Sequence, residues 1–235
     1  MRRYGRRTCN ALADNIMPLM RAKFTRGPET RSWTQQEFVQ ALCDAAERSG
    51  LPFVCTGTRR RHPCISPGPP LSMGQTSRCE YVDFELAVPV TAVEFGHRLS
   101  PALPQGVSLL WQRRMQASAP HLKAAVTGFW YRITGDFDAT RVSTFHTAAS
   151  WPMTRAKTSG DRLFDLKQRL IRLEVSPGQL IMKIVVQKDG TPKPAEVVAS
   201  IFGLSPQDAA ALPTERVAMT FTSECRPHSF EKELL

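Results

Sequence analysis

The sequence has no apolar run long enough to span a membrane. Such a helix needs ~18 consecutive apolar residues, and here Arg, Lys, Asp or Pro interrupts every run before that length. The chain is 42% hydrophobic and 22% charged, which is the balance of an ordinary globular protein and excludes wholesale disorder. Collagen-like, coiled-coil and disulfide-scaffold compositions are excluded as well. The 235 residues therefore predict a soluble, basic protein with a sizeable core and no membrane partner.

Paired cysteines are also missing. The six cysteines form no C-x-x-C pair, and no secretory signal precedes them, because residues 1–19 contain four arginines but no apolar core. We therefore expect free thiols in a reducing, cytoplasmic setting. We expect residues 1–19 to be either a disordered basic leader or the product of an early start codon, since Met17 and Met20 directly precede the first predicted strand.

Acidic residues are scarce in the first third of the chain. Residues 1–79 hold 13 basic and 5 acidic side chains, whereas residues 80–235 hold 18 and 16, so most of the net charge of +10 lies early. Arg outnumbers Lys by 23 to 8, and a guanidinium group forks onto phosphate and stacks on bases. This pattern favours a nucleic-acid binder. The alternative is a genome that simply prefers Arg as its basic residue.

Hydrophobic periodicity predicts an α+β protein with two ferredoxin-like (split β-α-β) halves and antiparallel sheets. The N-terminal half spans residues 20–118, and its predicted elements are a strand over 20–26, a helix over 34–49, strands over 51–55 and 81–90, a helix over 91–103 and a strand over 107–115. A long basic loop over 56–77 joins its second and third strands.

The C-terminal half, over residues 119–222, repeats that order of elements without repeating the residues themselves. Its predicted elements are a strand over 124–133, a helix or loop over 140–149, a strand or extended segment over 165–173, a strand over 179–187, a helix over 194–202 and a strand over 217–222. We expect a flexible connection over 150–162 and a frayed tail over 223–235.

Three adjacent arginines, Arg59, Arg60 and Arg61, mark the loop as the most unusual segment. No acidic residue lies between Glu47 and Glu80, so local carboxylates cannot neutralise this cluster. The cluster therefore requires phosphate or an acidic partner, unless it is a solvated charge run on a loop.

From His62 onward, the segment resembles the signature of the radical-SAM-linked family, a domain of unknown function. The resemblance is carried without a gap by His62-Pro63, Ile65-Ser66, Pro69-Pro70-Leu71, Gly74, Ser77 and Glu80-Tyr81. A weaker match extends over residues 20–222. Two departures stand out: Ser32-Trp33-Thr34-Gln35 replaces the family's Ser-His-Leu-Asp, and Arg59 to Arg61 replace its Phe-Asn-Pro.

The resemblance implies a partner and a setting. Members of this family are typically fused to, or encoded beside, a radical SAM protein with a cobalamin-binding region, and their genes neighbour a ribonuclease of the E/G type and ribosomal proteins. It therefore implies a radical SAM partner and RNA, either tRNA or rRNA. The chain itself lacks the C-x-x-x-C-x-x-C cluster of a radical SAM enzyme, so we expect it to carry no cofactor of its own.

Basic and aromatic side chains are the candidate RNA contacts. The predicted phosphate-binding residues are Arg59, Arg60, Arg61, His62, Arg78, Arg113 and Arg114. Trp111, Phe129, Trp130 and Tyr131 either stack on bases or, as is commoner for aromatics on strands, pack in the core.

Catalysis and metal binding have weaker support in the sequence. For catalysis, His62 would transfer a proton, Ser66 or Ser77 would donate a hydrogen bond, and Glu80 would orient the site. For a metal, Cys55, His62, Cys64 and Cys79 are available, but they lack the short paired spacings of structural zinc sites, so no metal is predicted.

Three functions follow from these observations. The first is a non-catalytic RNA-binding accessory of a radical SAM enzyme, the second a protein–protein adaptor of that enzyme without RNA, and the third an RNA- or nucleotide-modifying enzyme around His62. In each case we expect Ile65, Pro69, Pro70 and Leu71 to pin the loop against the domain. The arginine cluster and His62 would then stand at the rim of a groove between the halves, and Gly74 would allow a close backbone approach.

Overall fold

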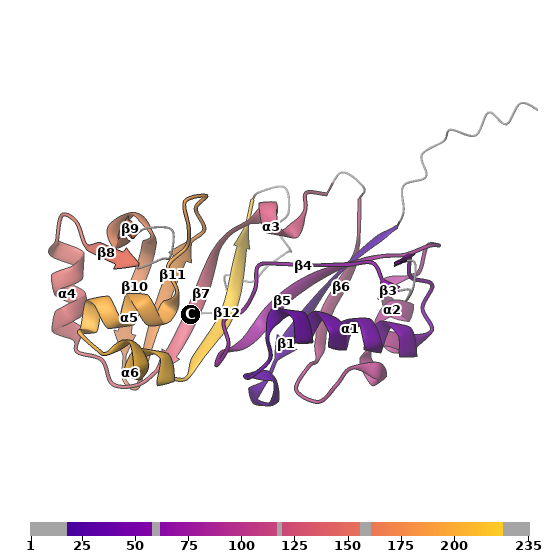
Figure 1. Cartoon of the computed structure of the whole chain (residues 1–235), viewed down its shortest axis with the longest axis horizontal. Helices are drawn as coiled ribbons and strands as arrows, with labels where there is room; N and C mark the ends of the chain where they lie inside the picture. Colours follow the sequence, from indigo (N-terminus) through magenta and orange to yellow (C-terminus); the bar gives the residue numbers. More distant parts are fainter. Residues whose placement is uncertain (1–17, 58–61, 117–118, 156–160, 223–235) are drawn as a thin grey trace, which may run out of the picture.

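An eight-stranded sheet runs along the length of the molecule in the computed structural model, which describes residues 18–57, 62–116, 119–155 and 161–222 (Figure 1). The N-terminal part supplies β1 (Leu19–Arg26), α1 (Gln35–Ser49), β2 (Cys55–Thr56), β3 (His62–Pro63), β4 (Ile65–Pro67), β5 (Thr76–Glu85), α2 (Ala92–Leu99) and β6 (Leu109–Met115). The C-terminal part supplies α3 (Leu122–Ala125), β7 (Val126–Thr134), α4 (Ala139–Thr147), β8 (Pro152–Arg155), β9 (Arg162–Asp165), β10 (Leu170–Ser176), β11 (Gln179–Val185), α5 (Pro194–Phe202), α6 (Pro206–Ala211) and β12 (Thr214–Phe221).

The same strand order occurs twice along this sheet. The N-terminal part has the order β4-β5-β1-β6 and the C-terminal part the order β10-β11-β7-β12, with all neighbours antiparallel within each part. A short parallel contact, in which Glu215 and Arg216 of β12 face Thr76 and Ser77 of β5, joins the two parts. The predicted α+β class with a mainly antiparallel sheet is confirmed.

Helix α1 forms where the sequence predicts a helix, because capping residues mark both of its ends. The side chain of Thr34 accepts a hydrogen bond from the backbone N–H of Glu37, and the Glu37 carboxylate accepts one from the N–H of Thr34. Gly50 ends the helix with φ of +63°, a left-handed conformation that favours glycine. The helix buries Phe38 and Leu42 on one face.

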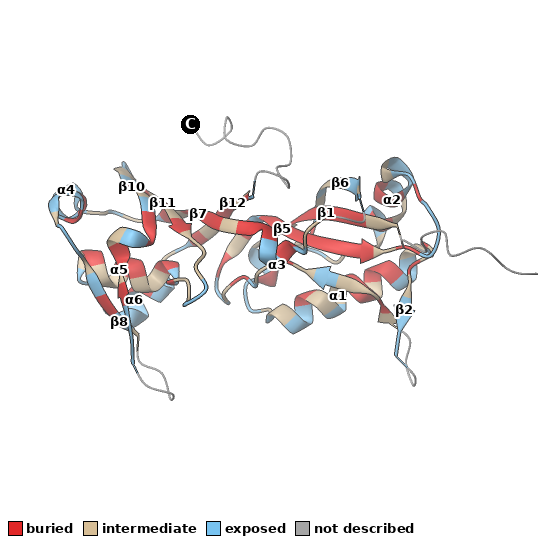
Figure 2. Cartoon of the chain, turned by 90° about the horizontal axis from the view of Figure 1, so that it is seen from above, coloured by how far each residue is buried: buried red, intermediate tan, exposed pale blue. Residues whose placement is uncertain are grey.

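Two hydrophobic clusters fill the space between helices and sheet. In the N-terminal part, α1 and α2 pack Phe38 and Phe95 against Phe84 of β5. In the C-terminal part, α5 packs Val197 and Ile201 against β7 and β11. Helices α1, α5 and α6 lie on the same side of the sheet (Figures 1 and 2). Figure 2 shows that buried residues occur on the strands of both parts.

Three local expectations are wrong. The strand expected over 51–55 is not a sheet strand, since Phe53 makes only an isolated bridge to Leu86. Its place is taken by β4, which lies inside the expected loop over 56–77 and pairs with β5. Within the flexible connection expected over 150–162, residues 152–155 form β8, which pairs with β9, whereas residues 156–160 lie outside the described residues. Helix α6 was not expected. Proline cannot donate a backbone hydrogen bond to a neighbouring strand, so a short edge strand that contains proline, such as β4, is not recognised from alternating hydrophobicity.

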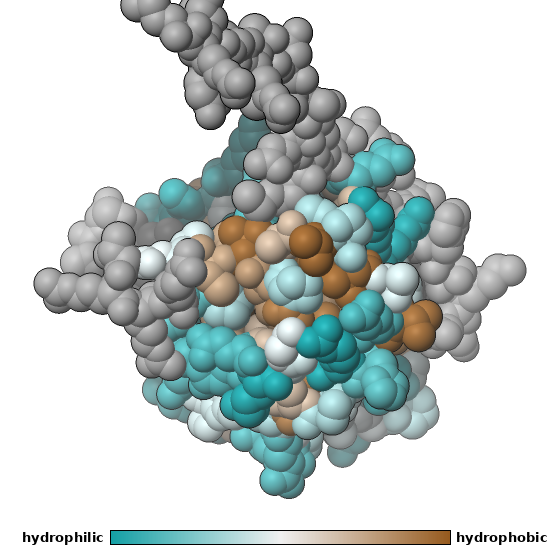
Figure 3. All heavy atoms as spheres, turned by 90° about the vertical axis from the view of Figure 1, so that its right-hand side faces the viewer, coloured by the Kyte–Doolittle hydropathy of each residue, from teal (hydrophilic) through white to brown (hydrophobic). Residues whose placement is uncertain are grey.

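The end of the molecule at which α2 lies carries exposed apolar side chains. Val88 and Val93 are 52% and 79% exposed, and Figure 3 shows apolar side chains gathered at this end among polar ones. In the part of the chain that the structure describes, no helix is long and apolar enough to cross a bilayer.

A close approach between strands makes Gly128 of β7 sensitive to substitution. A Cβ atom at this position would lie 2.9 Å from the carbonyl oxygen of Ile184 and 2.9 Å from Oγ1 of Thr220. We expect Gly128→Ala to lower the free energy of unfolding by about 1–3 kcal/mol, as overpacking does. Urea unfolding measures this loss. Thr134→Ala, at the exposed end of the same strand, is the control, and equal stability of the two variants would contradict the packing.

Candidate nucleic-acid interface

The motif segment, residues 62–81, is held in place through its backbone. The guanidinium of Arg216 on β12 donates hydrogen bonds to the carbonyl oxygens of Pro69 (3.2 Å) and Pro70 (2.7 Å). Leu71 is 4% exposed, and the N–H of Gly68 donates to the carbonyl of Tyr81 at 2.8 Å. Of the four residues expected to pin this segment by packing, Leu71 is buried, Ile65 and Pro69 are half-buried and Pro70 is exposed, so the expectation is confirmed only in part.

A buried charge cluster joins Glu80 of the motif segment to Arg26 and Arg216. Nη1 of Arg216 is 3.1 Å from Oε1 of Glu80, and both side chains are 3% exposed. The Arg216 guanidinium also lies over the ring of Phe129, 4.5 Å from its centroid. Burial alone would lower the pKa of Arg216, but its interactions with Tyr131 and Glu80 outweigh that effect and raise it.

Arg26 brings a second cation to the cluster. Its Nη2 donates to the carbonyl oxygens of Thr30 (3.0 Å) and Trp33 (2.9 Å), and its guanidinium lies over the ring of Phe38 at 4.9 Å. Burial lowers the pKa of Arg26, the charge of Glu80 opposes this shift, and the charge of Arg216 adds to it. Glu80 is therefore ion-paired with Arg216 of β12 and also interacts electrostatically with Arg26 of β1.

A second buried ion pair joins β1 to β5. Arg21 donates from Nε to Oδ1 of Asp83 at 2.7 Å and from Nη2 to Oδ2 at 2.9 Å, and Nη2 also reaches the carbonyl of Pro120 at 3.0 Å. Lys23, on the same strand, is 6% exposed. The basic residues of the first strand are therefore internal, and part of the early positive charge does not reach the surface.

Sequence reasoning missed the roles of Asp83 and Arg216. Arg216 donates a hydrogen bond to Glu80, which lies 136 positions away in the chain, so no local sequence pattern links the two residues. The sequence does contain one indication of buried cations: basic residues occur within segments of otherwise alternating apolar residues, over 20–26 and 214–221.

The proposed catalytic residues have separate surroundings. Nδ1 of His62 is 3.9 Å from Oε1 of Glu47, near the end of α1. Ser66 is exposed on β4 opposite Asp83, and Glu80 is buried against Arg216. The structure does not bring His62, Ser66 and Glu80 together in one site.

Two expectations about placement are wrong. His62 lies beside the C-terminal end of α1, away from the contact between β5 and β12, so it is not at the rim of a groove between the parts (Figure 1). Gly74 is not needed for a close approach, because a Cβ there would meet nothing within 4 Å; its φ of +84° explains the glycine. Arg59, Arg60 and Arg61 lie outside the described residues.

The remaining predicted phosphate contacts are on the surface but are not gathered in one place. Arg78 has a side chain 62% exposed, and its Nε is 2.8 Å from Oε1 of Glu215. Arg113 and Arg114 are exposed on the edge strand β6. As neighbours in a strand, these two side chains point to opposite faces of the sheet.

The four aromatic residues divide between core and surface. Phe129 and Tyr131 are 5% and 4% exposed and belong to the C-terminal core. Trp111 is half-buried, and its ring lies edge-on to Tyr81. Trp130 is half-buried on the other face of β7 from Phe129 and Tyr131.

Two of the candidate metal-binding thiols, Cys64 and Cys79, have raised pKa values. Burial, together with a hydrogen bond to Glu85 and its charge, raises the pKa of Cys64 to about 11, and burial raises that of Cys79 to about 12. Both thiols are therefore protonated near neutral pH. Among the described residues, no three His, Cys, Asp or Glu side chains come together to hold a metal ion.

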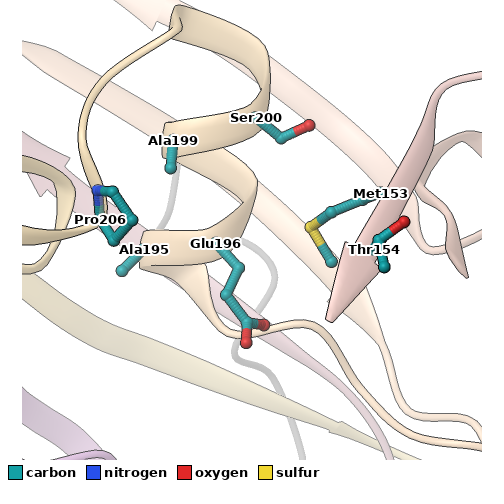
Figure 4. Close-up of a pocket in the computed structure, with 7 residues that line it drawn as sticks. All are labelled: Met153, Thr154, Ala195, Glu196, Ala199, Ser200 and Pro206. Carbon is teal, nitrogen blue, oxygen red and sulfur yellow. The ribbon is translucent and has the colours of Figure 1, made fainter. Parts of the chain in front are cut away.

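A groove of about 340 Å³ opens between β8 and α5 (Figure 4). Met153, Ala195 and Ala199 form much of its wall. Glu196 also lines it, and its carboxylate is engaged by Nε of Arg155 at 2.8 Å. The groove is mainly apolar and presents no free pair of groups for acid–base chemistry.

The buried charge cluster predicts a large effect for one substitution. Glu80→Ala would leave two buried guanidiniums without their carboxylate, and we expect it to lower the free energy of unfolding by about 3–5 kcal/mol. Glu174→Ala removes the carboxylate of an exposed pair with Arg172 and should cost less than about 1 kcal/mol. Urea unfolding of both variants is the measurement, and similar losses for the two would rule out the cluster as a source of stability.

Comparison with known proteins identifies a family without assigning an activity. A family model described as an uncharacterized protein conserved in bacteria (DUF2344) matches residues 20–194, roughly three quarters of the chain. No curated protein matches the chain. The matched residues include all of the motif segment, Arg21 and Arg26 of β1, and most of the sheet. The chain therefore belongs to the DUF2344 family of uncharacterized bacterial proteins.

Proposed function

We propose that this chain is an RNA-binding accessory protein, without catalytic activity of its own, that works with a separate radical SAM enzyme carrying a cobalamin-binding region. The radical SAM partner rests on the resemblance of the motif segment, and RNA binding rests on charge. The net charge of +10 and the excess of Arg over Lys support a polyanionic ligand.

One observation carries the proposal. Thr56 of β2 pairs with His62 of β3, so the short connection that contains Arg59, Arg60 and Arg61 starts and ends at one place beside the end of α1. No acidic residue occurs between Glu47 and Glu80. Three adjacent guanidiniums in a stretch of sequence without an acidic residue favour phosphate contacts.

The separate surroundings of the candidate catalytic residues favour binding over catalysis. A proton-transfer site needs its groups within hydrogen-bond reach of a common substrate. His62, Ser66 and Glu80 have different neighbours, and the carboxylate of Glu80 is occupied by Arg216.

We also infer that each part of the sheet is a ferredoxin-like unit. In a β-α-β-β-α-β unit, the third strand lies between the first and the second, and the fourth lies beside the first. The orders β4-β5-β1-β6 and β10-β11-β7-β12 both fit this description. Such units place their helices on one face and leave the other for ligands or partners.

Substitution of the three arginines tests RNA binding. We expect Arg59→Ala/Arg60→Ala/Arg61→Ala to weaken binding of a structured tRNA and to flatten the dependence of log Kd on log salt by about 2, since each phosphate contact contributes about 0.7–0.9 to that slope. The control is the triple Lys variant, which keeps the charge and should keep most of the slope.

A nuclease treatment separates this proposal from a purely protein-binding adaptor. A complex with the radical SAM partner that needs no RNA, together with unchanged tRNA affinity in the triple Ala variant, would contradict RNA binding through this connection. Loss of tRNA affinity in that variant alone supports it.

A further inference from the structure

A solvent-facing sheet surface centred on Trp130 lies on the opposite side of β7 from the core. Paired residues across four strands form one row on this surface: Arg172 on β10, Lys183 on β11, Trp130 on β7 and Ala218 on β12. A second row contains Glu174, Ile181, Arg132 and Glu215 on the same strands. We call these two rows, together with Arg78, the tryptophan face.

The Trp130 ring has cations on one side and a small residue on the other. Nζ of Lys183 is 5.2 Å from its ring centroid, and Cζ of Arg172 is 5.6 Å away. Both cations come from strands on one side of β7. On the other side, β12 places only the methyl group of Ala218 opposite the ring. A planar group can therefore approach the indole from that side while the cations stay beside it.

The charge of the tryptophan face is positive. Its four cations are Arg78, Arg132, Arg172 and Lys183, against two carboxylates. Glu215 lies between Arg78 at 2.8 Å and Arg132 at 3.5 Å, and so faces two cations at once. Helices α5 and α6 pack on the opposite face of the sheet and do not cover these residues (Figures 1 and 2).

We propose that the tryptophan face binds single-stranded RNA, with an unpaired base stacked on Trp130 and the adjoining phosphates at Lys183, Arg172 and Arg132. Proteins bind unpaired nucleotides by stacking aromatic rings on the bases and by placing cations against the phosphates of the backbone. An aromatic ring on an open sheet face with cations beside it provides both kinds of contact. A duplex keeps its bases stacked and cannot use the indole. The inference rests on the proposed RNA binding, but it places a contact in the C-terminal part, far along the chain from Arg59 to Arg61.

The surface fits RNA better than a protein partner. The core of a protein interface is usually depleted of charge, whereas charged groups surround Trp130 here. The two carboxylates of the tryptophan face, Glu174 and Glu215, are both ion-paired, and the four cations outnumber them, which leaves the net charge of the face positive.

Binding of an unstructured 12-nucleotide RNA to the full chain tests the inference. We expect Trp130→Ala to weaken binding by about 5- to 150-fold, the range for loss of one base–aromatic stack, with the salt dependence unchanged. Trp130→Phe should retain most of the affinity, and Lys183→Ala should flatten the salt slope. Ile171→Ala, an exposed apolar residue on β10, is the control and should bind as the wild type does.

The outcomes separate the two proposals. If the wild type binds RNA and both Trp130→Ala and the charge-reversing Lys183→Glu bind equally well, the tryptophan face is excluded while the proposed function stands. If the wild type binds no RNA at low salt, the proposed function fails and this inference fails with it. If Trp130→Ala instead abolishes a nuclease-resistant complex with the radical SAM protein, the face is a protein interface and the inference is overturned. Thermal unfolding of each variant checks that it folds.

Discussion

The ion pair between Glu80 and Arg216 is the contact on which the arrangement of the molecule depends. Charges this deeply buried are tolerated only when they are paired and hydrogen-bonded, and Arg216 meets that condition through one carboxylate, two proline carbonyls and an aromatic ring. The parallel contact between β5 and β12 involves only two residues of each strand. The side chains therefore stabilise a junction that the backbone ladder alone would hold weakly, and they bind the motif segment to it.

This junction has a consequence for the surface. Because β5 and β12 are neighbours, two four-stranded units form one sheet with helices α1, α5 and α6 on one side (Figure 2). Basic side chains then serve two purposes. Those of β1 hold the interior together, and those of β5, β7, β10 and β11 around Trp130 remain on the open face. The RNA contacts proposed for the tryptophan face belong to the second set, and the net charge of the sequence overstates the charge available to a ligand because the cations of β1 are buried.

Much of the fold could be predicted from local sequence, because the residues that begin and end its helices lie next to those helices in the chain. The capping residues Thr34 and Glu37, the stop at Gly50 and the proline that begins α5 mark helices that the structure contains. The short strand β4 is hidden by prolines, and its pairing with β5 is set by tertiary contact. The pairing of Glu80 with Arg216 could not be predicted, since Arg is usually a surface residue and the two side chains are brought together only by the contact between β5 and β12. The core positions of Phe129 and Tyr131 follow from strand alternation, whereas the cations beside Trp130 come from strands that only the topology brings together.

A double-mutant cycle on the junction tests this account most directly. Glu80→Gln, Arg216→Met and the double variant are compared by equilibrium urea unfolding. The account predicts that the double variant loses less stability than the sum of the two single losses, with a coupling energy of at least about 1.5 kcal/mol, because removing both partners leaves no uncompensated charge between them. Losses that add to within about 0.5 kcal/mol would show that the pair does not hold the two parts of the sheet together, and would contradict the account.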